Sequence, residues 1–493
     1  MEKIFEELIK QENIRANLST LRQFAKDNEK RVAIYRFFDD NGRLLAFFLE
    51  NEDAKTRKNI SLLLGDIEKN DAAMSLYQAY KREMTLFVKA SYLQALAKLD
   101  VESLVPQLKE DLNVLLASEI TEENKKHIDE ETRALRNILI RYEGITKHTV
   151  DLKGKAVEVL LITNRTQRET VRRMVTCGTA KVHPLGVLVE TEDVDTLMKL
   201  RTYREMVFPI LTNGFVPSEP EKCAKAIWEG GILELLRKLH KEDESFYYRI
   251  ECKSSMELEQ RSVFTKRLGA ELDRLSNGML VNSAGDYEVE LRLIANKDGE
   301  FFPCIKLFTI KNKRFAYRKN AIAASIHPST AALMVEIAAG YLKENAQIMD
   351  PFCGVGTMLI ERHKRVPAKE MYATDIFGEA IAFGRENAKA AGVKINFINR
   401  DFMEFEHGYL FDEIITNMPL RGKKTKTEMD EFYGAFFQKA KQILSDEAII
   451  VMYTNEMGFV KKQLRLNKEY TLLQETCMQT KNDFSLVILR YKR

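Results

Sequence analysis

The first 145 residues place apolar side chains three and four positions apart, with hardly any Gly or Pro between them. This spacing puts the apolar side chains on one face of a helix. We therefore predict an all-α domain over residues 1–145.

Two segments of this region share an arrangement that resembles a HEAT-type repeat. The charged stretch Glu52–Arg57 leads into the apolar stretch Ile60–Gly65, and a similar helix follows about 34 residues later. A plain helical bundle is the alternative. Three basic residues stand at the start of this segment, Lys55, Arg57 and Lys58. We interpret them as a solvated face in preference to a binding surface for RNA or protein.

Between residues 146 and 312 short alternating runs replace the helical spacing. Such runs of β-branched and aromatic residues predict strands. The predicted strands are Val157–Thr163, Gly186–Glu190, Phe246–Glu251, Tyr287–Leu293 and Pro303–Ile310. The predicted helices are Arg165–Met174 and Leu258–Leu275. We expect an α+β region of two subdomains.

Over residues 313–493 predicted strands alternate with helical stretches. The strands are expected at 347–349, 370–374, 394–398, 413–416 and 448–453. Alternating βα units predict a mostly parallel sheet with helices on both faces. A final pair of strands, Thr471–Cys477 and Ser485–Tyr491, predicts an antiparallel edge.

Composition limits the class of protein. A chain of 493 residues with 45% hydrophobic and 30% charged residues is expected to fold as two to four domains. A net charge of +3 neither requires nor excludes nucleic acid. The chain has no apolar run long enough to span a membrane. Its six cysteines form no C-x-x-C pair, so no metal site is expected, and reduced thiols fit a cytoplasmic protein.

A glycine-containing loop follows the first strand of the α/β region. Asp350-Pro-Phe-Cys-Gly-Val-Gly-Thr357 leads into a helix, and Gly354 and Gly356 allow a tight turn and close approach of a ligand. Open α/β sheets bind ligands at this end of their strands. Asp350 can bond an ammonium group, and Phe352 and Thr357 belong to the same predicted cofactor-binding loop. No Lys-Ser/Thr pair follows the glycines, which excludes a P-loop.

Acidic residues end the next two strands. Asp375, followed by Ile376, suits two ribose hydroxyls. Asp401 can accept a hydrogen bond from an adenine amino group, and Phe402 offers an apolar wall. Each acid by itself could be a helix cap or a loop residue. Because the motifs follow in order at the ends of successive strands, they indicate one ligand site.

These motifs resemble those of class I S-adenosyl-L-methionine (SAM)-dependent methyltransferases over about residues 320–493. They are most similar to the THUMP-domain RNA guanine-N2 methyltransferases. The resemblance implies a Rossmann-like domain over 313–493, SAM as cofactor, and methyl transfer to an exocyclic amine of tRNA or rRNA. In this family the fourth motif reads N/D-P-P-Y/F/W. Asn417 and Pro419 match it, whereas Met418 replaces the first proline and Leu420 replaces the aromatic residue.

The fourth motif carries the predicted catalytic residues. The lone pair of guanine N2 is delocalised, so Asn417 and the carbonyl of Met418 would accept its two hydrogens and aim it at the methyl group. Leu420 cannot stack on a base. Another aromatic residue could take that role, with Phe352, Phe402 and Tyr433 as the candidates. A second possibility is a different substrate, with protein or DNA as the options. A third is loss of activity, which would leave a non-catalytic RNA-binding or scaffold protein with a SAM pocket.

The resemblance extends upstream of the catalytic domain. Arg314–Arg318 and Ile326–Met334 are similar to the family's join between RNA module and catalytic domain. Phe246–Ile310 resembles a divergent THUMP domain, and residues 150–215 resemble the ferredoxin-like domain before it. This similarity implies that residues 146–312 bind the 3′ end of a tRNA. The helical region 1–145 lies outside the family pattern, and a protein partner for it is left open.

Basic residues near the fourth motif and the domain join are predicted to contact substrate phosphates. They are Arg318, Arg421, Lys423 and Lys424, and a solvated loop is the alternative for the last three. His327 is interpreted either as a helix cap or as a substrate contact.

Overall fold

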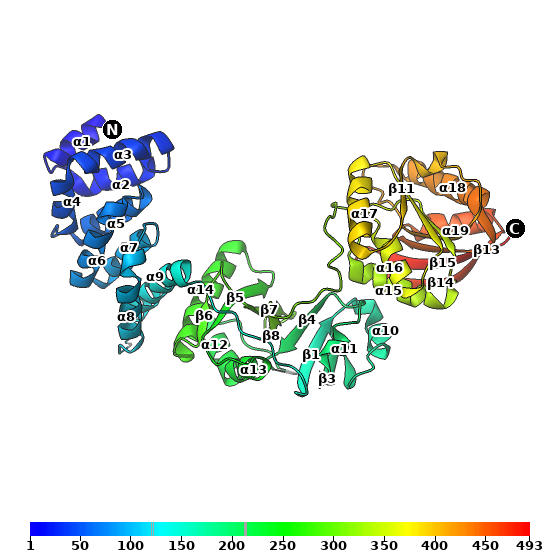
Figure 1. Ribbon diagram of the computed structural model, residues 1–493, viewed down its shortest axis with the longest axis horizontal. Helices are drawn as coiled ribbons and strands as arrows, with labels where there is room; N and C mark the ends of the chain where they lie inside the picture. The colour runs from blue at the N-terminus through cyan, green and yellow to red at the C-terminus, as the bar shows by residue number, and fades with distance from the viewer. Residues whose placement is uncertain (120, 122, 212–213) are drawn as a thin grey trace. The chain divides into compact units, whose positions relative to one another are not determined.

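A computed structural model describes residues 1–119, 121, 123–211 and 214–493, whose helices and strands are labelled in Figure 1. The chain divides into two compact units. Unit 1 holds Met1–Thr149, Phe215–Arg237 and Glu242–Phe301. Unit 2 holds Val150–Gly214, Lys238–Lys241 and Phe302–Arg493. None of the described helices is long and apolar enough to cross a membrane.

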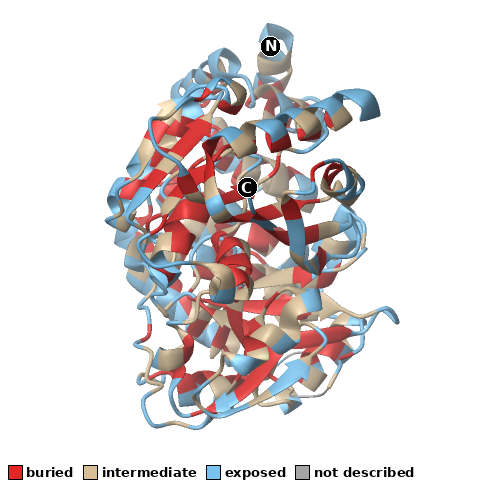
Figure 2. Ribbon diagram, turned by 90° about the vertical axis from the view of Figure 1, so that its right-hand side faces the viewer, coloured by how far each residue is buried: buried red, intermediate tan, exposed pale blue. Residues whose placement is uncertain are grey.

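The first part of unit 1 is helical, as predicted. Its helices are α1 (Glu2–Ile9), α2 (Ile14–Phe24), α3 (Asn28–Asp40), α4 (Gly42–Leu49), α5 (Ala54–Asp66), α6 (Ala73–Arg82), α7 (Leu86–Leu96), α8 (Val105–Leu116) and α9 (Lys125–Glu143). Asp53 begins α5 by accepting hydrogen bonds from the backbone N–H groups of Lys55 and Thr56. Figure 2 colours the chain by burial, and buried positions gather within the ribbon while exposed positions lie mainly along its outside.

Helices that are not consecutive in the sequence pack in a row in this part. Helix α2 packs against α5, α5 against α7, and α7 against α9. Gly65 permits the approach of α5 to α7, because a Cβ atom at this position would lie 2.7 Å from the Cα of Ala95. A row of this kind is compatible with helical repeats, although the HEAT resemblance stays a prediction.

The remainder of unit 1 is a small α+β layer tied to α9. It contains α12 (Pro220–Glu229), α13 (Ile232–Leu239), β5 (Phe246–Lys253), α14 (Leu258–Leu275), β6 (Leu280–Asn282) and β7 (Val289–Ala295). Strand β5 pairs in parallel with β6 and with β7. The guanidinium of Arg136 on α9 donates to Asp273 on α14 at 2.7 Å. Burial raises the pKa of Asp273 to about 6.

Unit 2 begins with an antiparallel sheet in the order β2-β3-β1-β4-β8. Its elements are β1 (Val157–Ile162), α10 (Arg168–Arg173), β2 (Thr179–His183), β3 (Gly186–Thr191), α11 (Val194–Leu197), β4 (Glu205–Pro209) and β8 (Phe301–Leu307). The prediction of one helix over Arg165–Met174 is wrong in part. Its first turn is a separate 3-10 turn, Arg165–Gln167, where Asn164 accepts a hydrogen bond from the N–H of Thr166.

The last part of unit 2 is the predicted α/β domain. Its strands are β9 (Gln347–Asp350), β10 (Glu370–Asp375), β11 (Asn396–Asn399), β12 (Phe411–Asn417), β13 (Leu444–Thr454), β14 (Tyr470–Gln479) and β15 (Phe484–Tyr491). Its helices are α15 (Pro328–Ala338), α16 (Thr357–Arg365), α17 (Gly378–Ala391), α18 (Lys426–Ile443) and α19 (Met457–Leu466). Helices α15 to α17 lie on one side of the sheet and α18 and α19 on the other (Figure 1).

The strand order of this sheet is β11-β10-β9-β12-β13-β15-β14. Strands β9 to β13 run parallel, and β15 is antiparallel to both β13 and β14, which confirms the predicted antiparallel edge. The chain order reverses between β9 and β12. A reversal of this kind opens a crevice at the carboxyl ends of the strands, where ligands bind.

Helix α16, which follows the glycine loop, is held by two buried acids. Arg201 donates to both carboxylate oxygens of Glu361 at 2.7 Å, and the hydroxyl of Tyr317 donates to the same group at 2.6 Å. On the same helix, Arg362 pairs with Glu413 of β12 at 2.6 Å. These contacts fix the middle of α16, the helix that follows the loop facing the crevice.

Candidate active site

The glycine loop between β9 and α16 is shaped by backbone contacts. The N–H of Gly354 donates to Asp375 at the end of β10, at 2.9 Å. Gly356 has a φ of 76° and precedes α16. A Cβ atom there would lie 2.8 Å from a ring carbon of Phe397. The loop therefore needs glycine at position 356, both for its backbone conformation and for its packing.

Asp350 presents an unsatisfied carboxylate to this loop. Its side chain is 1% exposed. Its Oδ1 accepts from the N–H of Phe352 at 3.2 Å, and its Oδ2 has no partner of good hydrogen-bond geometry among the described residues, although the hydroxyl of Thr416 lies near enough to lower the pKa of the acid. Burial raises the pKa of Asp350 to about 7, and the charge of Asp375 adds to the shift. An ammonium group would satisfy Oδ2 and remove the cost of burying the charge, so this residue fits the amino group of SAM.

Asp375 and the residues after it form the second part of the crevice edge. Asp375 Oδ1 accepts from the N–H of Phe377 at 3.0 Å, and each carboxylate oxygen keeps a lone pair for a ligand hydroxyl. Ile376 is 62% exposed and Phe377 63% exposed, so both offer apolar surface. Phe377 was not among the predicted site residues. The signal in the sequence was an aromatic residue directly after the strand-ending Asp375-Ile376 pair.

Asp401 and Phe402 lie at the end of β11 in different environments. Asp401 is exposed and caps the 3-10 turn Phe402–Glu404, accepting from the N–H of Met403 at 2.9 Å. The structure is therefore compatible with both roles of this acid, as a cap and as an acceptor for an adenine amino group, because the cap does not use its second oxygen. The structure corrects the expectation for Phe402, whose ring is 1% exposed and belongs to the hydrophobic core. Apolar surface at this edge comes instead from Ile376 and Phe377.

The fourth motif extends from the end of β12. Asn417 and Pro419 are half-buried, and Leu420 is 58% exposed. Met418 is held on both sides, since its side chain lies in the core and its N–H donates to the carbonyl of Tyr453 on β13 at 2.9 Å. The backbone at Met418 is thus fixed next to Asn417. Sheet order places this motif beside β9, which ends in Asp350.

Aromatic residues near the fourth motif differ in exposure. Phe402 and Tyr433 are buried in the core and cannot stack on an incoming base. Phe352 is half-buried, and its ring lies 5.4 Å from the half-buried ring of Phe432. The ammonium group of Lys424 lies 4.7 Å from the Phe432 ring. The remaining aromatic candidates are therefore Phe352, which was predicted, and Phe432, which was not.

The basic loop after the motif is open to solvent. Arg421, Lys423 and Lys424 are exposed, and none of them takes part in an ion pair with a described residue. Arg421 donates to the carbonyl of Lys424 at 3.1 Å, which closes the loop on itself. Their charges remain available to an anionic ligand.

At the domain join, Arg314 has a structural role, whereas Arg318 keeps a side-chain nitrogen without a hydrogen-bond partner among the described residues. Arg314 donates to the carbonyls of Leu200 and Tyr203 at 2.7 and 3.0 Å, so it holds unit 2 together. Arg318 is half-buried, its Nε has no hydrogen-bond partner among the described residues, and burial lowers its pKa. His327 caps α15 by accepting from the N–H of Ser329.

Comparison with known proteins defines the class of this domain. Residues 316–482 match the family model described as "RMKL-like, methyltransferase domain". The solved structure of SMU.472 in complex with SAH has 14% sequence identity and a TM-score of 0.50, and the match covers 69% of this chain and 99% of that one. This likeness shows the fold. The chain therefore carries a SAM-dependent methyltransferase domain, and SAM is its cofactor.

Curated relatives match part of the chain. The U6 snRNA (guanine-N(2))-methyltransferase THUMPD2 of Bos taurus is 29% identical over 155 residues, and the THUMPD2 of Homo sapiens matches equally. The match covers 31% of this chain and 29% of the relative. The carboxy-S-adenosyl-L-methionine synthase of Nautilia profundicola is 32% identical over 74 residues. The chain thus spans less than a third of the length of the THUMPD2 relatives it matches.

Proposed function

We propose that this protein methylates the exocyclic N2 of a guanosine in RNA, with tRNA as the expected substrate and rRNA as the alternative. The observation that carries the proposal is the position of Asn417. It ends β12 next to the strand that ends in Asp350, and the backbone after it is fixed by Met418. The guanine-N2 activity named for the THUMPD2 relatives supports the same chemistry.

The cofactor-binding roles follow from the donors and acceptors at the strand ends. SAM, when bound, supplies a methyl group made electrophilic by its sulfonium. Asp350 would hold the ammonium group of SAM, Asp375 its ribose hydroxyls, and Asp401 its adenine amino group. The exposed side chains of Ile376 and Phe377 would cover the adenine ring.

Asn417 and Met418 would orient the target amine. The Oδ1 of Asn417 and the carbonyl of Met418 accept its two hydrogens and aim the N2 lone pair into the crevice. Fixing this geometry before reaction lowers the entropic part of the barrier. As the new N–CH3 bond forms, the S–CH3 bond of the cofactor would break and leave a neutral thioether, and N2 would then release one proton to solvent water. The guanine must leave its stack to reach this depth, as target bases do in other base-modifying enzymes.

The domain division belongs to the proposal. The methyltransferase domain extends over residues 313–493. An RNA-binding region with ferredoxin-like and THUMP-like parts extends over residues 146–312, and a helical domain extends over residues 1–145. Phosphates of the RNA would contact Arg318 and the exposed loop of Arg421, Lys423 and Lys424. We further propose that the protein works in the cytoplasm.

Two departures from the family motif favour a second candidate function. Leu420 is exposed but has no aromatic ring, and Met418 is buried in the core. A protein with these substitutions could keep its SAM pocket and bind RNA without transferring a methyl group.

Radiolabelled SAM distinguishes these functions. Purified protein is incubated with bulk tRNA from a strain that lacks it, and the RNA is digested to nucleosides. We expect label in N2-methylguanosine, and a loss of about 10²–10³-fold in turnover for Asn417→Ala with unchanged SAM affinity. Label in another nucleoside would reject the guanine-N2 assignment. No label with tRNA or rRNA, while SAM binds, would leave the non-catalytic function.

A further inference from the structure

A basic groove runs along one side of the helical part of unit 1. It consists of three adjoining hollows of about 650, 820 and 310 Å³. Ser19 lines the first and the second hollow, and Lys58 and Phe87 line the second and the third. The shared residues make the hollows one continuous feature, which follows the row of helices α2, α5, α7 and α9.

Helix geometry explains why the basic side chains gather there. Ser19 and Arg22 follow Arg15 by four and seven residues, so the three lie on one face of α2, and Lys26 follows two residues after the end of this helix. On α5 the facing positions include Lys55 and Lys58. Because α2 and α5 pack side by side, these two faces form adjacent walls of the groove.

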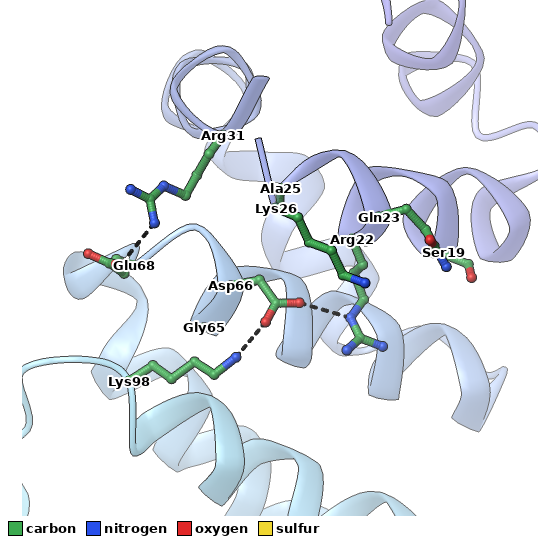
Figure 3. Close-up of a pocket in the computed structure, with 10 residues that line it drawn as sticks. All are labelled: Ser19, Arg22, Gln23, Ala25, Lys26, Arg31, Gly65, Asp66, Glu68 and Lys98. Atoms are coloured by element: carbon green, nitrogen blue, oxygen red, sulfur yellow. Dashed lines mark hydrogen bonds and ion pairs between the residues drawn. The ribbon is translucent and has the colours of Figure 1, made fainter. Parts of the chain in front are cut away.

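The first hollow shows how the walls are held (Figure 3). Asp66 on α5 accepts from Arg22 of α2 at 3.1 Å and from Lys98, just beyond α7, at 2.5 Å. This carboxylate therefore joins three successive elements of the row. Lys26 lines the same hollow and takes part in no ion pair with a described residue.

The lining of the second hollow is basic, and the nearby acid is Asp53, whose pKa is lowered by its hydrogen bonds to Thr56 and Lys55 and by the charge of Arg15. Arg15, Lys55 and Lys58 line it, no acidic residue does, and none of the three takes part in an ion pair with a described residue. Arg57, which lies between Lys55 and Lys58 in the same turn of α5, is different, because it pairs with the buried Glu83 at 2.8 Å and has a structural role.

The charge of the groove is opposite to that of the helical region. Residues 1–143 contain more Asp and Glu than Lys and Arg, so a solvated face of average composition would be slightly acidic. Phe87 adds an exposed aromatic ring between the second and third hollows, 38% exposed, with the Lys58 ammonium group 5.9 Å from its centroid. Cations beside an exposed aromatic ring are the combination that binds single-stranded nucleic acid.

We propose that this groove binds a single-stranded segment of RNA, with Arg15, Lys26, Lys55 and Lys58 on the phosphates and Phe87 stacked on a base. Four packed helices give it a length of roughly 25–30 Å, from interaxial distances of about 8–10 Å. The proposal rests on the proposed function for the identity of the ligand as RNA. It assigns the helical region a binding role separate from the SAM pocket.

The test measures binding of fluorescently labelled poly(U) to the full chain by anisotropy at several salt concentrations. The triple variant Arg15→Gln/Lys55→Gln/Lys58→Gln is expected to bind about 10- to 100-fold more weakly at 0.1 M salt, and its slope of log affinity against log salt is expected to shrink by about 2. Phe87→Leu is expected to weaken binding about tenfold, with the slope unchanged.

A matched control removes three exposed charges elsewhere in the helical region. Lys10→Gln/Arg36→Gln/Arg43→Gln has the same net charge as the groove variant and should bind poly(U) like the wild type. Equal loss in both triple variants would overturn a site-specific groove. Competition by poly-glutamate as strong as that by unlabelled poly(U) would also overturn it, in favour of an acidic protein partner.

Methyl transfer separates this proposal from the proposed function. If the wild type binds poly(U) through the groove but methylates no RNA, the groove proposal is retained and the proposed methyltransferase function is rejected. A groove variant that binds poly(U) and methylates tRNA like the wild type would retain the enzyme and reject the groove.

Discussion

Replacement of Asp350 by Asn tests how the site prepares for its cofactor. The carboxyl group is fully buried, and burial raises its pKa from the ordinary 3.8 to about 7. The folded protein therefore binds this proton more tightly than the unfolded chain does. It follows that the free energy of unfolding falls as pH rises from about 4 to about 7, and that the whole loss is present above pH 7.

The pKa difference sets the magnitude. A shift of about 3 units corresponds to about 4 kcal/mol at most. Asn resembles the protonated acid and carries no such cost. Without SAM, Asp350→Asn should be more stable than the wild type at pH 8, and its advantage should grow by about 2.5 kcal/mol between pH 5 and pH 8. The variant also lacks the buried carboxylate that would accept a hydrogen bond from the ammonium group of SAM. A charged hydrogen bond of about 1.5–3 kcal/mol predicts about 10- to 150-fold weaker SAM binding.

Two measurements check both parts of this prediction. Calorimetric unfolding at pH 5 and pH 8 follows stability, where about 1 kcal/mol shifts the midpoint by about 2–4 °C in a domain of this size. Titration calorimetry at pH 8 follows SAM affinity. Glu406→Gln removes an exposed acid of the same domain and should change neither quantity. A variant that unfolds and binds SAM like the wild type would refute the reasoning.

Two further predictions concern the fourth motif and the helical row. Leu420→Phe supplies the missing aromatic surface, and stacking of about 1–3 kcal/mol should raise kcat/KM for RNA about tenfold, whereas a fall would show that the target base does not lie there. Gly65→Ala brings a methyl group to 2.7 Å from the Cα of Ala95 and should lower the free energy of unfolding by about 1–3 kcal/mol. Its control is Gly42→Ala, with no atom within 4 Å, which should be neutral or stabilising by chemical denaturation.

The sequence alone indicated the helical character of residues 1–145, the alternation of strands and helices in the catalytic domain, and the residues that end its strands. Hydrophobic spacing is a local property, so it indicated the helices of residues 1–145 and the alternating strands after residue 313. Strand ends follow from the same pattern. Asp350, Asp375, Asp401 and Asn417 could thus be placed at one edge of a parallel sheet before their distances were known. The short strand β2, with its mostly exposed side chains, had no such pattern and was missed.

Tertiary structure decided which side chains are free to act. Phe402 and Tyr433 are aromatic in the sequence but lie in the core, while Phe377 is exposed. Arg314 donates hydrogen bonds to the carbonyls of Leu200 and Tyr203, which lie more than a hundred residues away in the sequence. The basic groove of unit 1 also exists only because helices far apart in the sequence pack side by side. Burial and pairing depend on such distant partners, and a local pattern of residues contains no information about them.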